Sequence, residues 1–285
     1  MPTDFLLQND GNGNFVDATA SAGAGGPSST QPGSASKIAA WGDYNADGLL
    51  DVVVASSTFD NGSSAYLLRN EGNGTFSDVT TQANMVISPE GNPCAVMWSD
   101  MDADGDHDLW VWNDRGNPTT NRSFMRNDDG VFTDDTVAVG ATFDVAHPMG
   151  IDGADLDRDG HIDYYVSNVA TNPLLRNNGD GTFSDASAAA GTLGDFGWGL
   201  GFEDFNHDGW WDIFVAQEDN LPYLTFYNQR SAPLAFTRQD WPHNNVASNG
   251  HNVAVAFADY DHDGKVDIVT ASTSGDRVTL YHNCL

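Results

Sequence analysis

Basic residues are scarce in this chain of 285 residues, which has 11 Lys and Arg against 41 Asp and Glu. The formal net charge at pH 7 is −30, and the sequence pI is about 4.1. A surface this acidic repels the phosphates of nucleic acids and of anionic membranes. We therefore expect no nucleic-acid partner.

Cysteine is also rare, and long apolar runs are missing. Cys94 and Cys284 are the only two cysteines, which excludes a disulfide framework but leaves one bridge possible. No apolar run approaches the ~18 residues that a membrane-spanning helix needs, so we expect no membrane insertion. The chain is 40% hydrophobic, which is too apolar for a disordered segment.

Acidic residues are abundant, and many of them lie in one repeated motif of nine residues. Its five copies, acidic loops 1 to 5, are DYNADGLLD (43–51), DMDADGDHD (100–108), DLDRDGHID (155–163), DFNHDGWWD (204–212) and DYDHDGKVD (259–267). The first Asp recurs every 49 to 57 residues. A period of this size is typical of propeller blades or solenoid units.

Short β-branched and aromatic runs flank the acidic loops, and a second motif recurs between them. Loop 1, for example, lies between 38–41 and 52–54. The second motif reads FLLQNDGNGNF (5–15), YLLRNEGNGTF (66–76), FMRNDDGVF (124–132) and LLRNNGDGTF (174–183), with a degraded copy at 226–236 and a partial one at 280–283. Asn-Gly and Asp-Gly between apolar runs predict β-hairpins. Each period therefore contains four antiparallel strands.

Four strands per repeat, without a helix signal, predict an all-β fold, a β-propeller of four-stranded antiparallel blades. The strand before each acidic loop alternates bulky residues with small ones, as Phe202 and Gly201 do, which suits strands crowded around an axis. We count 21 strands. The sequence favours a single domain over 4–285 with five blades, closed by the N- and C-terminal strands. The alternative is a piece of a longer ring.

Clustered carboxylates point to a bound cation. Carboxylates a few Å apart repel each other by ~1 kcal/mol per pair in water. Side-chain oxygens at positions 1, 3, 5 and 9, a backbone carbonyl at position 7 and Gly at position 6 suit a hard cation such as Ca²⁺. The Glu expected at position 12 of an EF-hand is absent. The alternative is a set of solvated turns, which the regular recurrence disfavours.

We therefore predict about five Ca²⁺ ions, one per repeat. The predicted ligands are Asp43, Asn45, Asp47, Leu49 and Asp51; Asp100, Asp102, Asp104, Asp106 and Asp108; Asp155, Asp157, Asp159, His161 and Asp163; Asp204, Asn206, Asp208, Trp210 and Asp212; and Asp259, Asp261, Asp263, Lys265 and Asp267.

The acidic loop, the strands around it and the LxRNxGxGTF hairpin together resemble the FG-GAP/VCBS repeats. These occur in integrin α-subunit propellers and in cartilage acidic protein-like propellers. The segment GWGLGFEDFNHDGWWDIFVAQ (197–217) is particularly similar. The resemblance implies Ca²⁺ on one face of a propeller, usually of seven blades, so five blades depart from the pattern. It also implies secretion and often adhesion, and members occur within enzymes, so function is not fixed.

A ligand site is expected on the face opposite the acidic loops, where the longer connections lie. The candidate residues are Trp198, His147, His251, Arg115, Trp241 and His243. We favour an adhesion-type module that binds a glycan, another ligand or a protein partner. The alternative is an enzyme at the mouth of the central channel, with His147 and His251 as acid/base groups. Two alternatives stay open: that these histidines are only surface groups without a chemical role, and that Trp198 is a core residue.

The N-terminal residues lead directly into repeat-like sequence and do not form a signal peptide. A chain trimmed of its leader has the same appearance. Together with the implied Ca²⁺ dependence and secretion, this leads us to expect an extracellular or periplasmic location.

Overall fold

The computed structural model describes residues 5–25, 35–58, 62–85, 92–114, 124–141, 147–217, 221–241, 252–272 and 277–284. The chain divides into two compact units, Met1–Ala138 and Val139–Leu285. Each unit is described by itself. No helix in the described ranges is long and apolar enough to cross a membrane.

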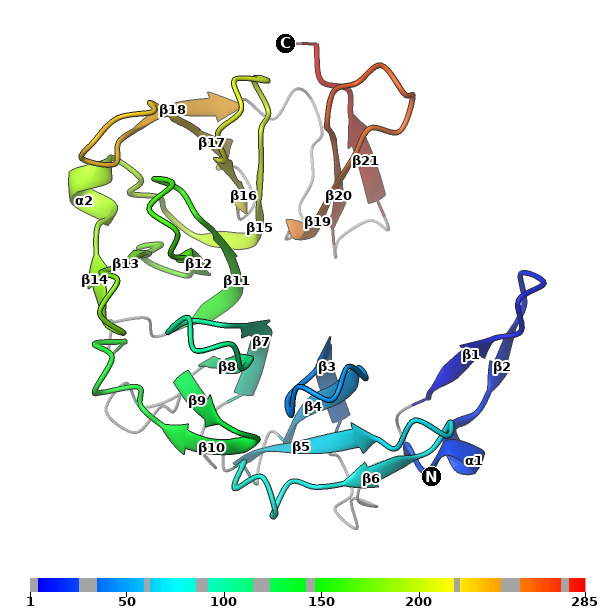
Figure 1. The fold of residues 1–285 in the computed structure, drawn as a ribbon. Coiled ribbons are helices and arrows are strands. Elements are labelled where there is room, and N and C mark those ends of the chain that lie inside the picture. Colours follow the sequence, from blue (N-terminus) through cyan, green and yellow to red (C-terminus); the bar gives the residue numbers. More distant parts are fainter. Residues whose placement is uncertain are drawn as a thin grey trace. The chain divides into compact units, whose positions relative to one another are not determined.

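The first unit contains a two-stranded sheet and two four-stranded sheets, all antiparallel (Figure 1). Its elements are β1 (Leu7–Asn9), β2 (Phe15–Asp17), α1 (Thr19–Ala22), β3 (Ala35–Gly42), β4 (Asp51–Thr58), β5 (Gly62–Asn70), β6 (Phe76–Asp78), β7 (Asn92–Ser99), β8 (Asp108–Asp114), β9 (Phe124–Asp128) and β10 (Val131–Asp134). The sheets are β1–β2, β3–β4–β5–β6 and β7–β8–β9–β10. Each four-stranded sheet follows chain order, as a propeller blade does.

The second unit contains two four-stranded sheets and one three-stranded sheet. Its elements are β11 (Pro148–Ala154), β12 (Asp163–Asn168), β13 (Leu174–Asn177), β14 (Phe183–Asp185), α2 (Ser187–Ala190), β15 (Gly197–Glu203), β16 (Asp212–Gln217), β17 (Tyr223–Asn228), β18 (Phe236–Trp241), β19 (Asn252–Ala258), β20 (Asp267–Ser272) and β21 (Arg277–Tyr281). The sheets are β11–β14, β15–β18 and β19–β21. The predicted all-β architecture of antiparallel blades is confirmed, with 21 strands in the described residues.

Every acidic loop joins the first strand of a blade to the second. In the blade β11–β14, Ala154 pairs with Asp163, so the hairpin closes on the last residue of acidic loop 3. The second strands are the most buried, and every residue of β12 and of β16 is buried. The acidic loops are therefore mounted directly on the core strands.

Neighbouring blades pack through small residues of the first strands. A Cβ on Gly201 of β15 would lie 2.4 Å from the ring of Phe257 on β19, and one on Gly42 of β3 would lie 2.5 Å from Trp98 on β7. Only glycine leaves room for these rings. This close approach confirms the predicted alternation of bulky and small residues on the first strands.

Local differences from the sequence prediction lie in the connections. The one-turn helices α1 and α2 were not predicted, because four residues are too few for a helical period. Each ends at a glycine in the left-handed region, Gly23 with φ 68° and Gly191 with φ 76°. The β9–β10 hairpin is a two-residue turn with positive φ at Asp129 and Gly130, as Asp-Gly predicts.

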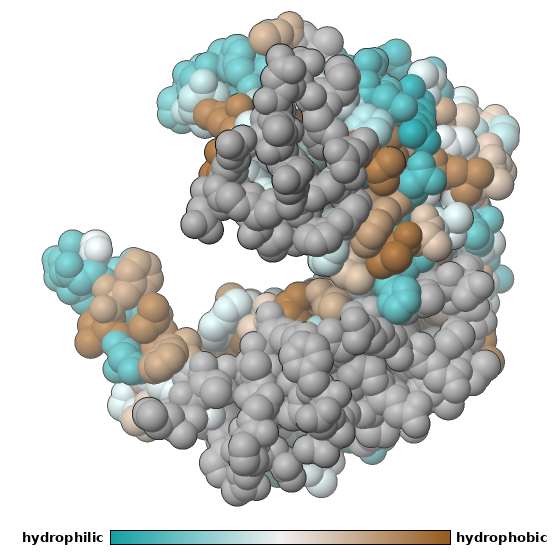
Figure 2. All heavy atoms as spheres, turned by 180° about the vertical axis from the view of Figure 1, so that it is seen from behind, coloured by the Kyte–Doolittle hydropathy of each residue, from teal (hydrophilic) through white to brown (hydrophobic). Residues whose placement is uncertain are grey.

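The N-terminal sheet exposes apolar side chains. Phe5, Leu7, Phe15 and Val16 are 68%, 55%, 65% and 55% exposed, and Figure 2 shows apolar residues at the surface of this hairpin. The C-terminal sheet β19–β21 has three strands. Closure of five blades by these terminal strands stays a prediction, and so does the single domain over 4–285.

Candidate metal centres

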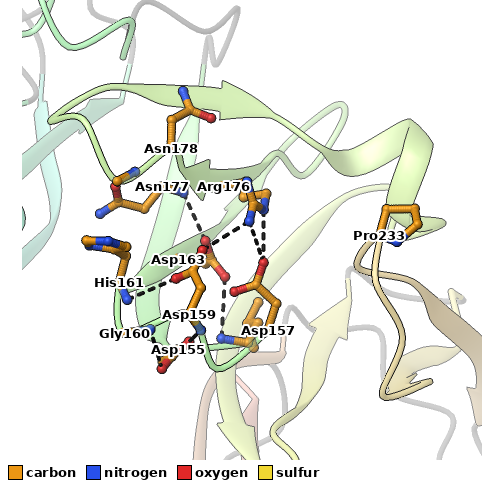
Figure 3. A network of polar contacts seen from close by, with 12 residues as sticks. Asp155, Asp157, Asp159, Gly160, His161, Asp163, Arg176, Asn177, Asn178 and Pro233 are labelled. Atoms are coloured by element: carbon orange, nitrogen blue, oxygen red, sulfur yellow. Dashed lines mark hydrogen bonds and ion pairs between the residues drawn. The ribbon is translucent and has the colours of Figure 1, made fainter.

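Each acidic loop folds around the carboxylate at its position 1. In acidic loop 3, the two oxygens of Asp155 accept the backbone N–H groups of Asp159 and Gly160, each at 3.1 Å (Figure 3). Positive φ at positions 4 and 6, 61° at Arg158 and 91° at Gly160, turns the chain back on itself. The same two hydrogen bonds form on Asp43, Asp100, Asp204 and Asp259.

The carboxylate at position 9 anchors the loop to its blade. In acidic loop 3, Asp163 is 1% exposed. One of its oxygens accepts the N–H of Leu156 at 3.4 Å, and the other accepts that of Asn177 at 2.9 Å. The equivalent Asp51, Asp108, Asp212 and Asp267 are equally buried and accept the equivalent pairs of N–H groups. The position 9 carboxylate thus joins the start of the loop to the following hairpin.

Between these anchors, the carboxylates at positions 3 and 5 lie beside position 1. In acidic loop 3, carboxylate oxygens of Asp155, Asp157 and Asp159 all lie within 4.8 Å of one another. In loops 2 and 5 the groups within this distance are instead positions 1, 3 and 9, namely Asp100, Asp102 and Asp108, and Asp259, Asp261 and Asp267. Loops 1 and 4 have an amide at position 3 instead, Asn45 and Asn206. Loops 2, 3 and 5 therefore each bring together three carboxylates that could hold a metal ion.

One oxygen in acidic loop 3 lacks the partner that burial demands. The side chain of Asp157 is 14% exposed, and its Oδ2 contacts Arg176. Its Oδ1 is buried and accepts no hydrogen bond from the described residues. An unpaired buried carboxylate oxygen is costly unless a cation lies beside it. The residues present therefore fit a metal ion.

Burial also changes the acidity of the position 9 carboxylates. Desolvation raises the pKa of Asp108, of Asp163 and of Asp212 to about 7, although two backbone N–H groups on each of them act in the opposite direction. Desolvation likewise raises the pKa of Asp51. A divalent cation among these groups favours the ionised form, so the loops are built around charges that an ion would stabilise.

The hairpin that follows each loop supplies two residues that the sequence analysis did not single out. The first is an asparagine. Asn228 donates its backbone N–H to Asp212 of its own blade at 2.8 Å and its side-chain amide to the carbonyl of Leu156, at position 2 of the preceding loop, at 2.9 Å. Asn127 and Asn283 make the equivalent side-chain contacts to Tyr44 and Phe205. The recurrence of this Asn in each hairpin motif was the sequence signal that could have indicated its role.

The second is the residue before that asparagine. Arg176 donates to Oδ2 of Asp157 at 2.6 Å and to Oδ2 of Asp159 at 3.0 Å (Figure 3). In the last repeat, Nε2 of His282 lies 3.1 Å from Oδ2 of Asp261 and 3.4 Å from Oδ2 of Asp263. A positively charged or nitrogen-bearing side chain therefore lies against positions 3 and 5 in these two repeats.

At position 7, the backbone N–H donates to the position 5 carboxylate in every loop. In acidic loop 3, His161 donates to Asp159 at 3.0 Å. Equivalent bonds are made by Leu49, Asp106, Trp210 and Lys265. This turn brings position 7 next to the other predicted ligands. The role of its carbonyl as a ligand stays a prediction, as does the complete set of five ions.

The described candidates for a ligand site lie in the second unit. His147 precedes β11, and Trp198 is the second residue of β15, so both lie at the ends of first strands opposite acidic loops 3 and 4. Trp198 is half-buried, and its ring stacks on Phe196 with centroids 5.9 Å apart. Trp241 packs against an apolar cluster that includes Phe205 and Ile268. Arg115, His243 and His251 lie outside the described residues. The alternative site of an enzyme at His147 and His251 stays a prediction.

Both cysteines are thiols in the structure. Cys94 lies on β7 and is partly buried, and Cys284 follows β21 and is exposed.

Comparisons with solved structures give distant likenesses, including the three that follow. A lectin from Agrocybe aegerita, described as recognising non-reducing terminal N-acetylglucosamine, is 17% identical, with 84% of this chain and 74% of that chain covered and a TM-score of 0.38. The V. cholerae biofilm matrix protein Bap1 is 16% identical, with coverages of 84% and 34% and a TM-score of 0.48. BBS1N, in its complex with ARL6DN, is 12% identical, with coverages of 88% and 79% and a TM-score of 0.41.

Sequence comparison is more specific. No curated protein sequence matches the chain. The profile of the FG-GAP-like repeat matches residues 43–111, 155–215 and 204–270. These three matches begin at the first Asp of acidic loops 1, 3 and 4 and together span more than half of the chain. The chain therefore belongs to the FG-GAP-like repeat family.

Proposed function

We propose that this protein is a calcium-stabilised binding module. Ca²⁺ ions in the acidic loops stabilise the first hairpin of each blade. A carbohydrate or protein ligand binds at the opposite ends of the first strands. The observation that carries the metal part is the buried Oδ1 of Asp157, which lacks a hydrogen bond from the described residues beside Asp155 and Asp159.

Calcium fits these loops better than other common ions. The side chains at positions 1, 3, 5 and 9 offer only oxygen in all five loops, which favours hard cations. Ca²⁺ accepts irregular sets of six to eight oxygens, whereas Mg²⁺ demands a near-ideal octahedron. Calcium-binding modules outside the cell work at about 10⁻⁴–10⁻³ M Ca²⁺. An extracellular or periplasmic location is part of the proposal.

Thermal melting in EDTA and in millimolar Ca²⁺ tests the metal part. We expect Ca²⁺ to raise Tm by mass action, since the ion binds the folded loops. Asp157→Asn removes the charge of the buried, unpartnered oxygen, so it should reduce the Ca²⁺-dependent rise in Tm and remove one ion from the stoichiometry measured by calorimetry.

Asp195→Asn is the matched control, because Asp195 is an exposed carboxylate outside the acidic loops and its loss changes the net charge equally. This variant should keep the full Ca²⁺ response. Identical melting curves in EDTA and Ca²⁺ for the wild-type protein would contradict the proposal.

For the ligand part, the supporting observation is the stacked pair Phe196 and Trp198. Both rings are partly exposed, and they lie at the start of β15, at the end of the blade opposite acidic loop 4. Partly exposed aromatic faces bind the apolar faces of sugars or of protein side chains, and Trp is enriched at binding hot spots.

A glycan array and a binding screen of secreted proteins would identify a ligand, and Trp198→Ala should weaken its binding by at least tenfold. Trp211→Ala is the control within the same blade, because Trp211 is 45% exposed but belongs to acidic loop 4. If both variants lost binding equally, or if neither variant lost binding, the ligand would bind elsewhere.

A further inference from the structure

In acidic loop 5, an imidazole lies beside two carboxylates of the loop. Nε2 of His282 is 3.1 Å from Oδ2 of Asp261 and 3.4 Å from Oδ2 of Asp263. These three groups come together from the loop and from the residue after β21. We propose that His282, Asp261 and Asp263 form a binding site for a nitrogen-preferring divalent metal of the Zn²⁺ class.

The third repeat shows that a cationic side chain can lie at this location. The residue before the hairpin asparagine is Arg69, Arg126, Arg176, Tyr227 or His282 in the successive repeats. In the third repeat, the guanidinium of Arg176 lies on Oδ2 of Asp157 and of Asp159, the same two positions. An arginine supplies its own charge and cannot bind a metal. A histidine can release its proton and offer a lone pair instead.

The spacing of the three atoms suits a tetrahedral ion. Zn²⁺ binds nitrogen and carboxylate oxygen at about 2.0–2.1 Å, so neighbouring ligand atoms lie about 3.3 Å apart. The two distances from His282, 3.1 and 3.4 Å, bracket that value, and all three ligand atoms lie within 4.8 Å of one another. Three protein ligands leave the fourth position of the ion open to water.

Neighbouring groups fix the imidazole in this orientation. Asn283, the next residue, is held by its N–H bond to Asp267 and its side-chain bond to Phe205. The ring of Tyr260 meets that of His282 edge to face at 6.3 Å. Nδ1 lies 3.5 Å from Sγ of Cys284, which leaves Nε2 toward the carboxylates. A partner on the second ring nitrogen is the usual companion of a metal-binding histidine.

Nitrogen ligation separates this site from the proposed calcium loops. Imidazole suits Zn²⁺, Co²⁺, Ni²⁺ and Cu²⁺, whereas Ca²⁺ prefers oxygen alone. Because Asp261 and Asp263 are also predicted calcium ligands, the inference rests on the proposed cation-binding role of the loops. We infer that Zn²⁺ displaces Ca²⁺ from loop 5 and leaves the other four loops to Ca²⁺.

Zinc titration of the full chain in saturating Ca²⁺ tests the site. Calorimetry should give one Zn²⁺ per chain, and Co²⁺ in its place should give the intense visible absorption of a tetrahedral, nitrogen-ligated ion. His282→Arg should abolish that absorption and weaken Zn²⁺ binding at least tenfold, because loss of a direct ligand costs no less than loss of a supporting group. The third repeat shows that an arginine fits here, so the variant should melt at or above the wild-type Tm.

His262→Asn is the matched control. His262 lies in the same loop, is exposed and has φ 62°, which Asn tolerates; it should keep Zn²⁺ binding. Cys284→Ser should also keep Zn²⁺ binding. Loss of Zn²⁺ binding in this variant would indicate that the thiol is the ligand and would overturn the assignment. Equal Zn²⁺ binding by His282→Arg and wild type, or no binding by wild type, would also overturn it. If Ca²⁺ had no effect on Tm while Zn²⁺ still bound through His282, the proposed function would be refuted and the zinc site would stand.

Discussion

At the scale of single residues, the crowded acids of each loop have separate roles set by position. Position 1 caps the turn, position 9 is buried and ties the loop to the hairpin, and positions 3 and 5 present oxygens between them. The negative charge of each loop is therefore divided between carboxylates that anchor the turn and carboxylates that are candidate metal ligands. The anchors persist because backbone N–H groups compensate part of the cost of burying a carboxylate.

A second acidic pair lies outside the loops, on the first strands of two neighbouring blades. Asp152 of β11 accepts the N–H of Gly153 at 2.9 Å. Burial raises the pKa of Asp152. Burial, followed by the charges of Asp152 and Asp204, raises the pKa of Glu203 on β15. Neither residue belongs to a repeated motif, so no sequence pattern singles them out.

The raised pKa of Asp152 predicts a pH dependence of stability. The folded state holds this proton more tightly than the unfolded chain, whose Asp titrates at about 3.9. Ionisation of Asp152 therefore lowers the unfolding free energy as pH rises from about 4 through the folded pKa. Asp152→Asn lacks this loss, so its Tm relative to wild type should increase with pH, measured by thermal melts in saturating Ca²⁺.

Asp180→Asn supplies a control of opposite sign. The hydrogen bond from Thr182 lowers the pKa of Asp180, so wild-type stability from this group is present above about pH 4 and lost on acidification. The Tm of this variant relative to wild type should therefore not increase with pH. Parallel pH profiles for the two variants would refute the assignment to Asp152.

At the scale of elements, the hairpin is as much a part of the candidate metal centre as the acidic loop. Its asparagine contacts residues 14 to 20 positions away within the blade and, in three repeats, a residue 72 to 83 positions away in the preceding blade. The sequence predicted the hairpin from its turn residues and assigned no role to this asparagine. Contacts across blades depend on how the sheets pack, which a local pattern does not specify.

Removal of one such asparagine should destabilise two blades together. Asn228 is 2% exposed, and its side chain donates to the carbonyls of Leu156 and Trp211. Asn228→Ala removes the donor to both carbonyls, the first of them in a buried hydrogen bond, so we expect a loss of about 2–4 kcal/mol in the free energy of unfolding. Chemical denaturation in Ca²⁺ measures the loss.

The control is Asn178→Ala, in the hairpin of the preceding blade. Among the residues that the structure describes, Asn178 bonds only locally, to Thr182 and Ser184, and it is exposed. Its loss should therefore stay within about 0.5 kcal/mol. A similar small effect for Asn228→Ala would show that the contact between blades adds little stability.

At the scale of the whole molecule, the terminal sheets are the incomplete ones. Phe15 of β2 corresponds in its hairpin motif to Phe132, Phe183 and Phe236, which are 0%, 6% and 8% exposed, whereas Phe15 is 65% exposed. The difference arises because β1 and β2 form a sheet of two strands. On β21, Val278 is also 72% exposed.

Closure of the ring by the terminal strands predicts that Phe15 is buried in solution. Phe15→Ala should then lower the free energy of unfolding by about 3–5 kcal/mol, as for a core phenylalanine. Val137→Ala is the control, because Val137 is 75% exposed and belongs to no repeated motif. A loss below about 0.5 kcal/mol for Phe15→Ala would indicate an open surface and contradict closure.

The sequence alone determined the repeat, the antiparallel strands and the acidic loops, because each depends on residues within a few positions of one another. Turn glycines, alternating side-chain size and clustered carboxylates all act locally. Tertiary structure decided which carboxylate is buried, which asparagine joins two blades and which side chain lies against positions 3 and 5. His282 meets Asp261 only after β20 and β21 have paired, and no spacing rule encodes that contact.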